Sequence, residues 1–530
     1  MLLRTRETTW KRSTTEIPSF PEDGYVELRT SAAGGAAPMR PDGTGYDARV
    51  GTPREAAVVG GAPPRAAADV AWAATALLVP LILGLVSLMG AIDLAYHLRT
   101  GDLILAERSL PRVDTYTFSV AGTPWVDQQW GAQVILALVF RMGGWPTLIA
   151  LQAVLGTVSF AFVYLAARAR GASARMAAAL TLAGFLLAYP MITLRPQLIA
   201  LPTFGAALWA ISTRERAPRR LWLLPMLAVV AANLHGSFTL LPVLAGLTWF
   251  DDVSRRSAGA KRTLIVVFAT GAATLLNPYG FGAWRYAFDL STDPIIRDSI
   301  TEWAPITIGS ALGAATLVSV LGIAALFARR MTPVRWVDLL TLGLFLLLAL
   351  SASRAVLWWA MVAPIVVAGL LAPSPSEPRE GESAGSRGPA IVLIAGLLTA
   401  IAVLLPWWRG SSYDRHLEAA PPGVTEALRA LPAGSRIFAY QPWGSWFVYA
   451  LPEQPVFVDS RIEIVPTSTW EDYFQVAFAG ARWREVLERW QPDAIVAEVD
   501  EWEEMIAVIR GDPEWRVLYE DDDGVIFVPI

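Results

Sequence analysis

Long apolar segments recur through most of the sequence, and they are the feature that most limits how this chain can fold. The 530 residues are 54% hydrophobic and only 17% charged, whereas soluble domains carry roughly a quarter charged residues. Apolar runs of about 18 or more residues are long enough to cross a bilayer as helices. The sequence therefore predicts a polytopic α-helical membrane protein and excludes a chain made only of soluble domains.

Arginine-rich segments between the apolar runs give the runs an orientation. Short loops rich in Arg and Lys stay on the cytoplasmic side of a membrane, and such loops occur at 168–175, 214–220, 255–262 and 329–335. An even number of spans must separate any two of them. The segment Trp130–Met142 is too short to cross and is expected to lie along the outer face or to re-enter the membrane. The prediction is about eleven spans, at 70–92, 145–167, 176–192, 197–213, 221–234, 236–250, 263–277, 308–328, 336–351, 354–372 and 390–408.

Changes of composition along the chain predict its domains. Residues 1–69 are rich in Gly, Ala, Pro, Thr and Arg without an apolar period, which predicts a disordered cytoplasmic N-terminal tail. A multi-span domain follows at 70–372, with a first outer loop at 93–144. The Pro- and Ser-rich segment 373–389 is expected to be a flexible cytoplasmic linker. A last span at 390–408 then leads to an extracytoplasmic domain at 409–530.

The C-terminal region has the charge and the pattern of a soluble domain. From Arg409 onward there are 10 basic and 22 acidic residues, a net charge of −12 in a chain whose total is −4. Strand-like and helix-like segments alternate, which predicts a small α/β domain. The expected strands are 436–440, 455–459, 493–498 and a hairpin over 515–529, and the expected helices are 421–431, 470–479, 482–490 and 501–510.

Missing residues and motifs exclude several kinds of chemistry. The chain has no cysteine, so disulfides, thiol catalysis and iron–sulfur clusters are excluded. Only three histidines occur, which leaves little material for a His-rich metal site. No GxxxxGK[ST] phosphate-binding loop or Gly-x-Ser-x-Gly elbow is present. Nothing in the sequence supports nucleic-acid binding.

Polar residues gather in the loops of one predicted membrane face. They lie in the first outer loop and in the outer turns between later spans, as Asp93, His97, Asp127, Arg195, Asn233, His235, Glu302 and Arg354. A transporter would instead be expected to place ionisable residues near the bilayer midplane on broken helices. Clustering at one face therefore favours a reaction site at the outer surface of the membrane.

Asp93 and His97 form the most informative pair of this set. They are four residues apart and share one face if the segment is helical. A carboxylate at this position could act as a general base toward an acceptor hydroxyl, with His97 orienting it or donating to a phosphate. The structural alternative is that Asp93 only caps a surface helix. Likewise His235 could only satisfy a helix end, and Arg195 and Arg354 could only reach toward lipid headgroups.

A series of spaced short motifs resembles bacterial GT-C-type membrane proteins, which are glycosyltransferases that use polyprenyl-phosphate sugars. The resemblance covers roughly residues 70–530. In better understood branches an acidic pair often follows the first span, whereas here Leu94 follows Asp93. The motifs are Asp93…His97-Leu-Arg-Thr-Gly101, Leu110-Pro111…Asp114-Thr-Tyr-Thr-Phe-Ser119, Pro124-Trp-Val-Asp127…Trp130, Arg195-Pro-Gln197, Asn233-Leu-His235-Gly236, Asn277-Pro-Tyr-Gly280, Glu302-Trp303 and Val456-Phe-Val-Asp459-Ser-Arg461.

This resemblance implies specific roles. Asp93 would be the catalytic base, and Asp127 a second acidic residue that supports the acceptor or binds a divalent cation. Arg195 and Arg354 would hold the phosphate of the lipid-linked donor, because guanidinium groups match phosphate geometry. The motif residues Asn233, His235 and Glu302 are expected to bind substrate. No cofactor is certain.

The resemblance also implies a location and partners. The expected place is the outer face of a bacterial cytoplasmic membrane, where the protein contacts membrane lipids and its lipid-linked donor. The acceptor is a glycan, a lipid or a protein, and the sequence does not choose among them. Three other functions stay open: an O-antigen polymerase or ligase type of enzyme, a transporter or flippase of lipid-linked sugars, and a non-catalytic scaffold. Convergence of the polar residues on one outer cavity would favour an enzyme.

Overall fold

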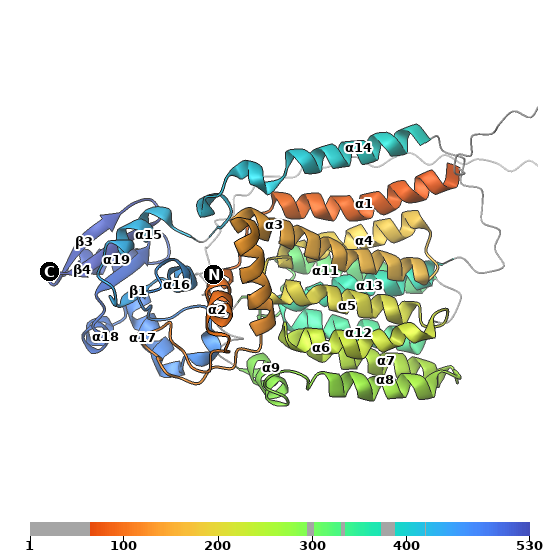
Figure 1. Ribbon diagram of the computed structural model, residues 1–530, viewed down its shortest axis with the longest axis horizontal. Coiled ribbons are helices and arrows are strands. Elements are labelled where there is room, and N and C mark those ends of the chain that lie inside the picture. The colour runs from red at the N-terminus through yellow and green to blue at the C-terminus, as the bar shows by residue number, and fades with distance from the viewer. Residues whose placement is uncertain (1–63, 294–300, 330–333, 373–386, 419) are drawn as a thin grey trace, which may run out of the picture. The chain divides into compact units, whose positions relative to one another are not determined.

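The structure is a computed structural model that describes residues 64–293, 301–329, 334–372, 387–418 and 420–530. Most of the predicted N-terminal tail (1–69) and of the predicted linker (373–389) lies outside these residues. The described part of the chain consists of a bundle of apolar helices, a group of shorter elements at one end of that bundle, and a small C-terminal sheet with its own helices (Figure 1).

The bundle helices form at the predicted apolar runs. Among the described residues, six helices are long and apolar enough to cross a membrane, and two shorter apolar helices, Pro196–Ser212 and Trp336–Ser351, lie beside them. The chain is therefore a polytopic helical membrane protein. The bundle consists of α1 (Pro64–Val86), α3 (Trp130–Ala169), α4 (Ala174–Ala188), α5 (Pro196–Ser212), α6 (Leu223–Ala232), α7 (Leu240–Ser254), α8 (Ala260–Ala273), α11 (Ala311–Arg329), α12 (Trp336–Ser351), α13 (Val356–Leu371) and α14 (Arg387–Val403).

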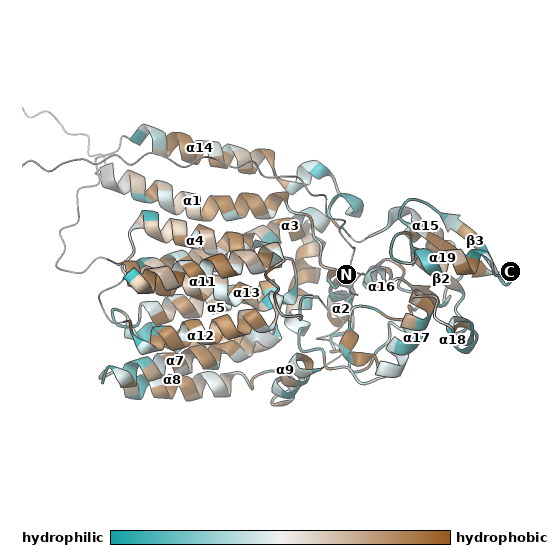
Figure 2. Cartoon of the chain, turned by 180° about the vertical axis from the view of Figure 1, so that it is seen from behind, coloured by the Kyte–Doolittle hydropathy of each residue, from teal (hydrophilic) through white to brown (hydrophobic). Residues whose placement is uncertain are grey.

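Small residues let the central helices pack closely, while larger apolar residues face outward. A Cβ atom added to Gly184 of α4 would lie 2.4 Å from the carbonyl oxygen of Ala360 in α13, so the two backbones touch, as membrane helices do at small residues. Phe268, Val318 and Leu347 are about two-thirds exposed, as suits contact with lipid. Figure 2 shows that the bundle helices are hydrophobic along most of their length and hydrophilic at their ends.

Helix α3 bends sharply, which gives the predicted short outer helix its place. Gly143 and Gly144 have non-helical backbone angles, with φ of +69° at Gly144, and Pro146 follows them. Glycine tolerates this angle and proline has no N–H for the helical ladder. The hydroxyl of Thr147 donates to the carbonyl oxygens of Val139 and Gly144 at 2.9 and 2.6 Å. The first part of α3 consequently runs across the bundle axis beside α2 (Leu94–Glu107) (Figure 1).

The C-terminal domain contains a four-stranded mixed sheet. Its strands are β1 (Ile437–Ala439), β2 (Ala494–Glu498), β3 (Trp515–Glu520) and β4 (Gly524–Pro529), in the order β1-β2-β4-β3. β1 and β2 are parallel, with Phe438 opposite Ile495, and the other pairs are antiparallel. The helices are α15 (Pro422–Arg429), α16 (Gln441–Ala450), α17 (Thr467–Ala477), α18 (Trp483–Trp490) and α19 (Glu503–Arg510).

Two elements of this domain differ from the sequence prediction. Helix α16 was not expected, although Pro442 near its start is a favoured residue for a first helical turn. The predicted strand 455–459 is not a regular strand. It forms isolated bridges at Val456 instead, to Ile437 of β1 and to Thr117 of the first outer loop. This segment therefore joins the sheet to the outer loop rather than extending the sheet.

Arg461 fastens the first outer loop to the C-terminal domain. Its side chain has no exposed surface, and its guanidinium donates to Asp114 at 2.5 Å and to Asp459 at 2.6 Å. The rings of Tyr116 and Trp125 lie 4.7 Å from the guanidinium carbon, close enough for cation–π attraction. Asp114 and the two rings belong to the outer loop, so this cluster holds together segments that are 347 residues apart.

We predict that Arg461→Gln lowers the free energy of unfolding by about 3–5 kcal/mol, because it leaves two buried carboxylates without their cation. The matched control is Arg429→Gln, which removes an exposed ion pair with Glu426 in the same domain and should cost at most about 1 kcal/mol. Thermal unfolding of both purified variants in one detergent measures the difference. Equal losses in the two variants would contradict the role given to Arg461.

Candidate functional site

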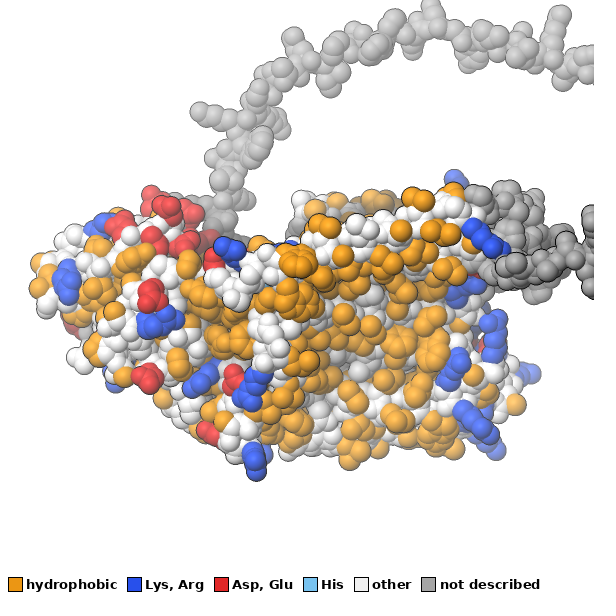
Figure 3. All heavy atoms as spheres, turned by 45° about the horizontal axis from the view of Figure 1, so that its top comes forward, with side chains coloured by type: hydrophobic (Ala, Val, Ile, Leu, Met, Phe, Trp, Pro, Cys, Tyr) orange, Lys and Arg blue, Asp and Glu red, His pale blue; other side chains and the backbone are white. Residues whose placement is uncertain are grey.

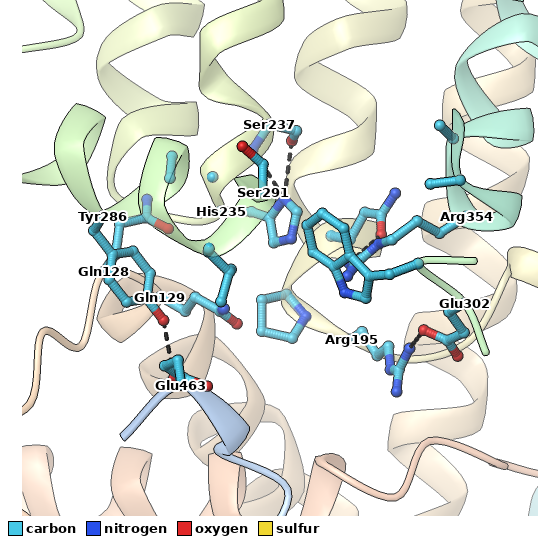
Figure 4. Close-up of a pocket in the computed structure, with 18 of the residues that line it drawn as sticks. Gln128, Gln129, Arg195, His235, Ser237, Tyr286, Ser291, Glu302, Arg354 and Glu463 are labelled. Atoms are coloured by element: carbon cyan, nitrogen blue, oxygen red, sulfur yellow. Dashed lines mark hydrogen bonds and ion pairs between the residues drawn. The ribbon is translucent and has the colours of Figure 1, made fainter. Parts of the chain in front are cut away.

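A cavity of about 620 Å³ lies where the bundle, helix α9 (Gly282–Thr292) and the C-terminal domain meet. Five of the eight residues singled out from the sequence line it, and four of these are labelled in Figure 4 as Arg195, His235, Glu302 and Arg354. Segments far apart in the sequence contribute to this wall. Its polar and aromatic residues include Asp93, Tyr96, Gln128, Arg195, Gln197, His235, Ser237, Trp284, Tyr286, Ser291, Glu302, Trp303, Arg354, Gln441, Ser460 and Glu463.

Arg195 ties two carboxylates together at one side of the cavity. It precedes Pro196 at the start of α5, where its backbone is extended, and this places its side chain outside the helix. Its Nε donates to Oδ1 of Asp93 at 3.0 Å, and its Nη1 donates to Glu302. Burial opposes the ionisation of Asp93, but the charge of Arg195 together with the hydrogen bonds and charge of His97 and Arg195 outweighs burial and holds the pKa of Asp93 well below its ordinary value. Asp93 is therefore an ionised, paired carboxylate.

Arg354 is a second cation in the wall, and its surroundings differ from those of Arg195. Its Nη2 donates to the side-chain oxygen of Gln197 at 2.9 Å, and its guanidinium carbon lies 4.8 Å from the ring centre of Trp303. Its backbone N–H donates to the carbonyl oxygen of Glu302 at 3.1 Å, which joins the turn before α13 to the segment before α11 that carries Glu302. Within the described ranges, no carboxylate lies within 4.0 Å of this guanidinium. Arg354 is thus a half-buried cation that could receive an external anion.

His235 contributes a neutral hydrogen-bond donor. It lies in the turn between α6 and α7, and its Nδ1 accepts the backbone N–H of Ser237 at 3.1 Å (Figure 4). Burial, with the charge of Arg354 adding to it, lowers the pKa of His235 to about 3. The ring is therefore neutral near pH 7, and its proton is on Nε2 because Nδ1 accepts.

Three predicted site residues are not part of the cavity wall. The side chain of Asn233 accepts from Trp130 at 3.2 Å and donates to two backbone carbonyls, so it joins the start of α3 to the turn after α6. His97 and Asp127 lie behind the wall and are connected through Gln133. His97 Nε2 is 3.8 Å from Oδ2 of Asp93, which is longer than a hydrogen bond.

Sequence reasoning missed the wall that the C-terminal domain supplies. Glu463 faces the cavity from this domain, and Tyr286 of α9 donates to its carboxylate at 2.9 Å (Figure 4). Burial raises the pKa of Glu463 above its ordinary value. The nearby Asp459-Ser-Arg461 motif marked the region, but no local pattern pointed to Glu463 itself. This pair spans 177 residues, so only the folded structure brings it together.

The carboxylates of the site do not fit a divalent cation. In the described part of the chain, no three His, Asp or Glu side chains are grouped so that they could hold a metal ion. Asp93 and Glu302 both direct oxygen atoms at Arg195, so each is already held by a protein cation. Asp127, the other residue considered for a cation, binds Gln133 instead.

We predict that Asp127 makes the protein less stable as pH rises. Burial, partly offset by Gln133, raises the pKa of Asp127 to about 7, whereas an unfolded chain releases this proton near pH 4. Between these values the folded state holds the extra proton, so the free energy of unfolding falls by up to about 1.4 kcal/mol per pH unit.

Asp127→Asn should remove this slope between about pH 4 and pH 7, as measured by chemical unfolding in detergent at several pH values. Asp289→Asn, which changes an exposed carboxylate, should keep the wild-type slope. A wild-type slope that persists in Asp127→Asn would show that another group is responsible.

Comparisons with known proteins find similar solved structures at low sequence identity. No family model and no curated protein matches the sequence. The structure is similar to the oligosaccharyltransferase of Archaeoglobus fulgidus in the apo form, with 11% identity over 81% of this chain and 70% of that one, and a TM-score of 0.49.

It is also similar to ArnT from Cupriavidus metallidurans. The form bound to undecaprenyl phosphate has 14% identity, covers 88% of this chain and 98% of that one, and gives a TM-score of 0.49. The apo form has 14% identity, covers 88% and 97%, and gives a TM-score of 0.48.

Proposed function

We propose that the protein is a glycosyltransferase that moves a sugar from a polyprenyl-phosphate donor to an acceptor at the outer face of a bacterial cytoplasmic membrane. The observation that carries this proposal is the charge arrangement of the cavity. Arg354 is a half-buried cation without a carboxylate partner within 4.0 Å among the described residues, and it lies in the same wall as the Arg195–Asp93 ion pair. Such a site suits an anion together with a reacting hydroxyl group.

The proposed orientation follows from the charges at the ends of the bundle. Basic side chains gather at the end of the bundle opposite the C-terminal domain (Figure 3), in the segments after α3, α5 and α7. Arg- and Lys-rich short loops are retained in the cytoplasm. The cavity and the C-terminal domain then face outward, and the N-terminal end of the chain faces the cytoplasm.

The proposed donor matches both the charge and the surroundings of the cavity. A phosphate between Arg354 and Arg195 would receive hydrogen bonds from planar guanidinium groups, which suit phosphate oxygens. The neutral His235 adds a further donor. The apolar outer surface of the bundle would take the lipid chain. Undecaprenyl phosphate, the ligand of one ArnT structure, is a lipid of this kind.

The proposed chemistry is displacement at C1 of the sugar. The acceptor oxygen forms a bond to C1, the bond from C1 to the phosphate oxygen breaks, polyprenyl phosphate leaves, and the acceptor proton passes to a carboxylate. Asp93 is our candidate base. Its pairing with Arg195 weakens it as a base, because the cation stabilises the ionised form. A donor phosphate that takes over Arg195 would release Asp93 and raise its pKa, so donor binding would itself activate the base.

We predict that Arg354→Gln weakens donor binding about 10- to 100-fold, because it removes a hydrogen bond between charged groups worth roughly 1.5–3 kcal/mol. The control is Arg141→Gln, which removes a half-exposed cation paired with Asp102 and should leave binding unchanged. The measurement is binding and transfer with a panel of radiolabelled polyprenyl-phosphate sugars, using purified protein in nanodiscs. Labelled lipid that crosses vesicle membranes without being consumed would favour a transporter instead.

We predict that Asp93→Asn reduces transfer about 10²- to 10⁴-fold, the usual contribution of a general base. Glu463→Gln is the matched comparison. It neutralises a second cavity carboxylate, which Tyr286 contacts and Arg195 does not. It should retain transfer within about tenfold, the cost of one lost hydrogen bond being near 1 kcal/mol. The reverse order of the two variants would assign the base to Glu463. Equal transfer by wild type and both variants would remove both carboxylates from the chemistry.

A further inference from the structure

Three buried polar side chains form a row directly behind the cavity wall. The exposed fractions of His97, Asp127 and Gln133 are 1%, 2% and 0%. The side-chain nitrogen of Gln133, Nε2, lies 2.8 Å from Oδ1 of Asp127 and 3.2 Å from Nδ1 of His97. The other ring nitrogen of His97 faces Oδ2 of Asp93 at 3.8 Å. The row therefore leads from Asp127 to the carboxylate next to Arg195.

Close packing of α2 against α3 brings the row together. His97 and Gly101 are one turn apart on α2, so they share a face. A Cβ atom added to Gly101 would lie 2.1 Å from the carbonyl oxygen of Gln133. Glycine at this position lets α2 rest directly on the backbone of α3, and this contact sets the distance between His97 and the Gln133 amide.

The hydrogen-bonding capacity of each group limits where the protons can be. The Gln133 nitrogen carries two hydrogens and accepts none. When one hydrogen goes to ionised Asp127, the other points to Nδ1 of His97, which must then carry no proton. Burial lowers the pKa of His97, so the ring is neutral and its single proton is on Nε2. That N–H faces the Asp93 carboxylate.

Protonation of Asp127 reverses this arrangement. A protonated Asp127 has a hydroxyl that needs an acceptor, and its Oδ2 is buried without a hydrogen-bond partner among the described residues. The proton is therefore better placed on Oδ1, where the Gln133 amide can turn to present its oxygen, Oε1, which also has no other partner among those residues. This oxygen also faces His97, which satisfies it by carrying its proton on Nδ1. Nε2 of His97 then carries no proton, and its lone pair faces the negative charge of Asp93. The two arrangements differ only in one proton on Asp127, one amide rotation and the tautomer of His97.

We propose that Asp127 and Gln133 are positioning residues: through the orientation of the Gln133 amide, they set which ring nitrogen of His97 carries the proton. The inference goes beyond the proposed sugar transfer and touches it only through Asp93. In the Nε2–H form, His97 supports the ionised Asp93. In the Nδ1–H form it repels Asp93 and favours a proton between the two.

Other ionisable groups around the row come from four parts of the chain, and none of them contacts the Gln133 amide in the described residues. Asp127 titrates near pH 7 because of its burial, with smaller contributions from the C-terminal domain. The groups that act on Asp127 or His97 are Arg461 and Glu463 of the C-terminal domain, Tyr279 and Tyr286 at and before α9, Tyr96 and Asp93 at α2, and Arg195 and His235 of the outer turns.

The test is ¹⁵N NMR of the full-length protein in lipid bilayers with labelled histidine, which separates protonated from bare ring nitrogens without requiring turnover. The chain has three histidines, so His97→Asn assigns the His97 signals by their loss. In the wild type, we expect the Nε2–H tautomer at high pH and the Nδ1–H tautomer at low pH. The two ¹⁵N signals of His97 should exchange with a midpoint near the pKa of Asp127.

Two variants and one control test the connection. Gln133→Met and Asp127→Asn should each abolish the exchange with pH, the first by breaking the link and the second by removing the titrating group. Gln152→Met, the same substitution at another fully buried glutamine of α3, should keep it. One tautomer throughout in the wild type, a doubly protonated His97, or an exchange that survives in either variant would overturn the proposal.

Discussion

The outer half of the molecule depends on the ion pairs that the fully buried Arg461 makes with Asp114 and Asp459. A guanidinium without exposure costs several kcal/mol of lost hydration unless carboxylates and further contacts compensate it. Asp459 supplies one carboxylate from the same segment, and Asp114 supplies the other from the first outer loop. Among the described residues, the outer loop gives Asp114 no cation of its own, so this buried carboxylate is paired only when the loop contacts the domain. Aromatic rings of the loop enclose the remaining face of the cation.

That contact explains why the cavity has walls from such distant segments. The outer loop carries Asp93 at its start, and the domain carries Glu463 two residues after Arg461. Fastening the loop to the domain therefore brings both carboxylates to one cavity. The bundle contributes the cations from the turns that precede α5 and α13, where the membrane helices end.

The sequence predicted the parts of this structure that local patterns determine. Apolar runs specify helices because burial in lipid requires a continuous apolar surface, and span parity specifies which turns share a face. Arg195, His235 and Arg354 could be grouped on this basis. Glu463 could not, because its partner Tyr286 is remote in sequence. Gln133 gave no signal either, since one amide in an apolar helix looks like any other until its neighbours are known.

The bend at Gly143 and Gly144 makes one helix serve two layers of the molecule. Its first part carries Gln133 and lies against α2, while its second part runs inside the bundle beside α5 and α1. One continuous helix therefore sets the position of the polar residues behind the cavity relative to the bundle. The order of synthesis adds a further consequence. The outer loop is synthesised long before Arg461, so until then Asp114 lacks its ion-pair partner. If synthesis stops before Arg461, the membrane helices are all present but Asp114 lacks its cation. The outer loop of such a truncated protein is then open to cellular proteases.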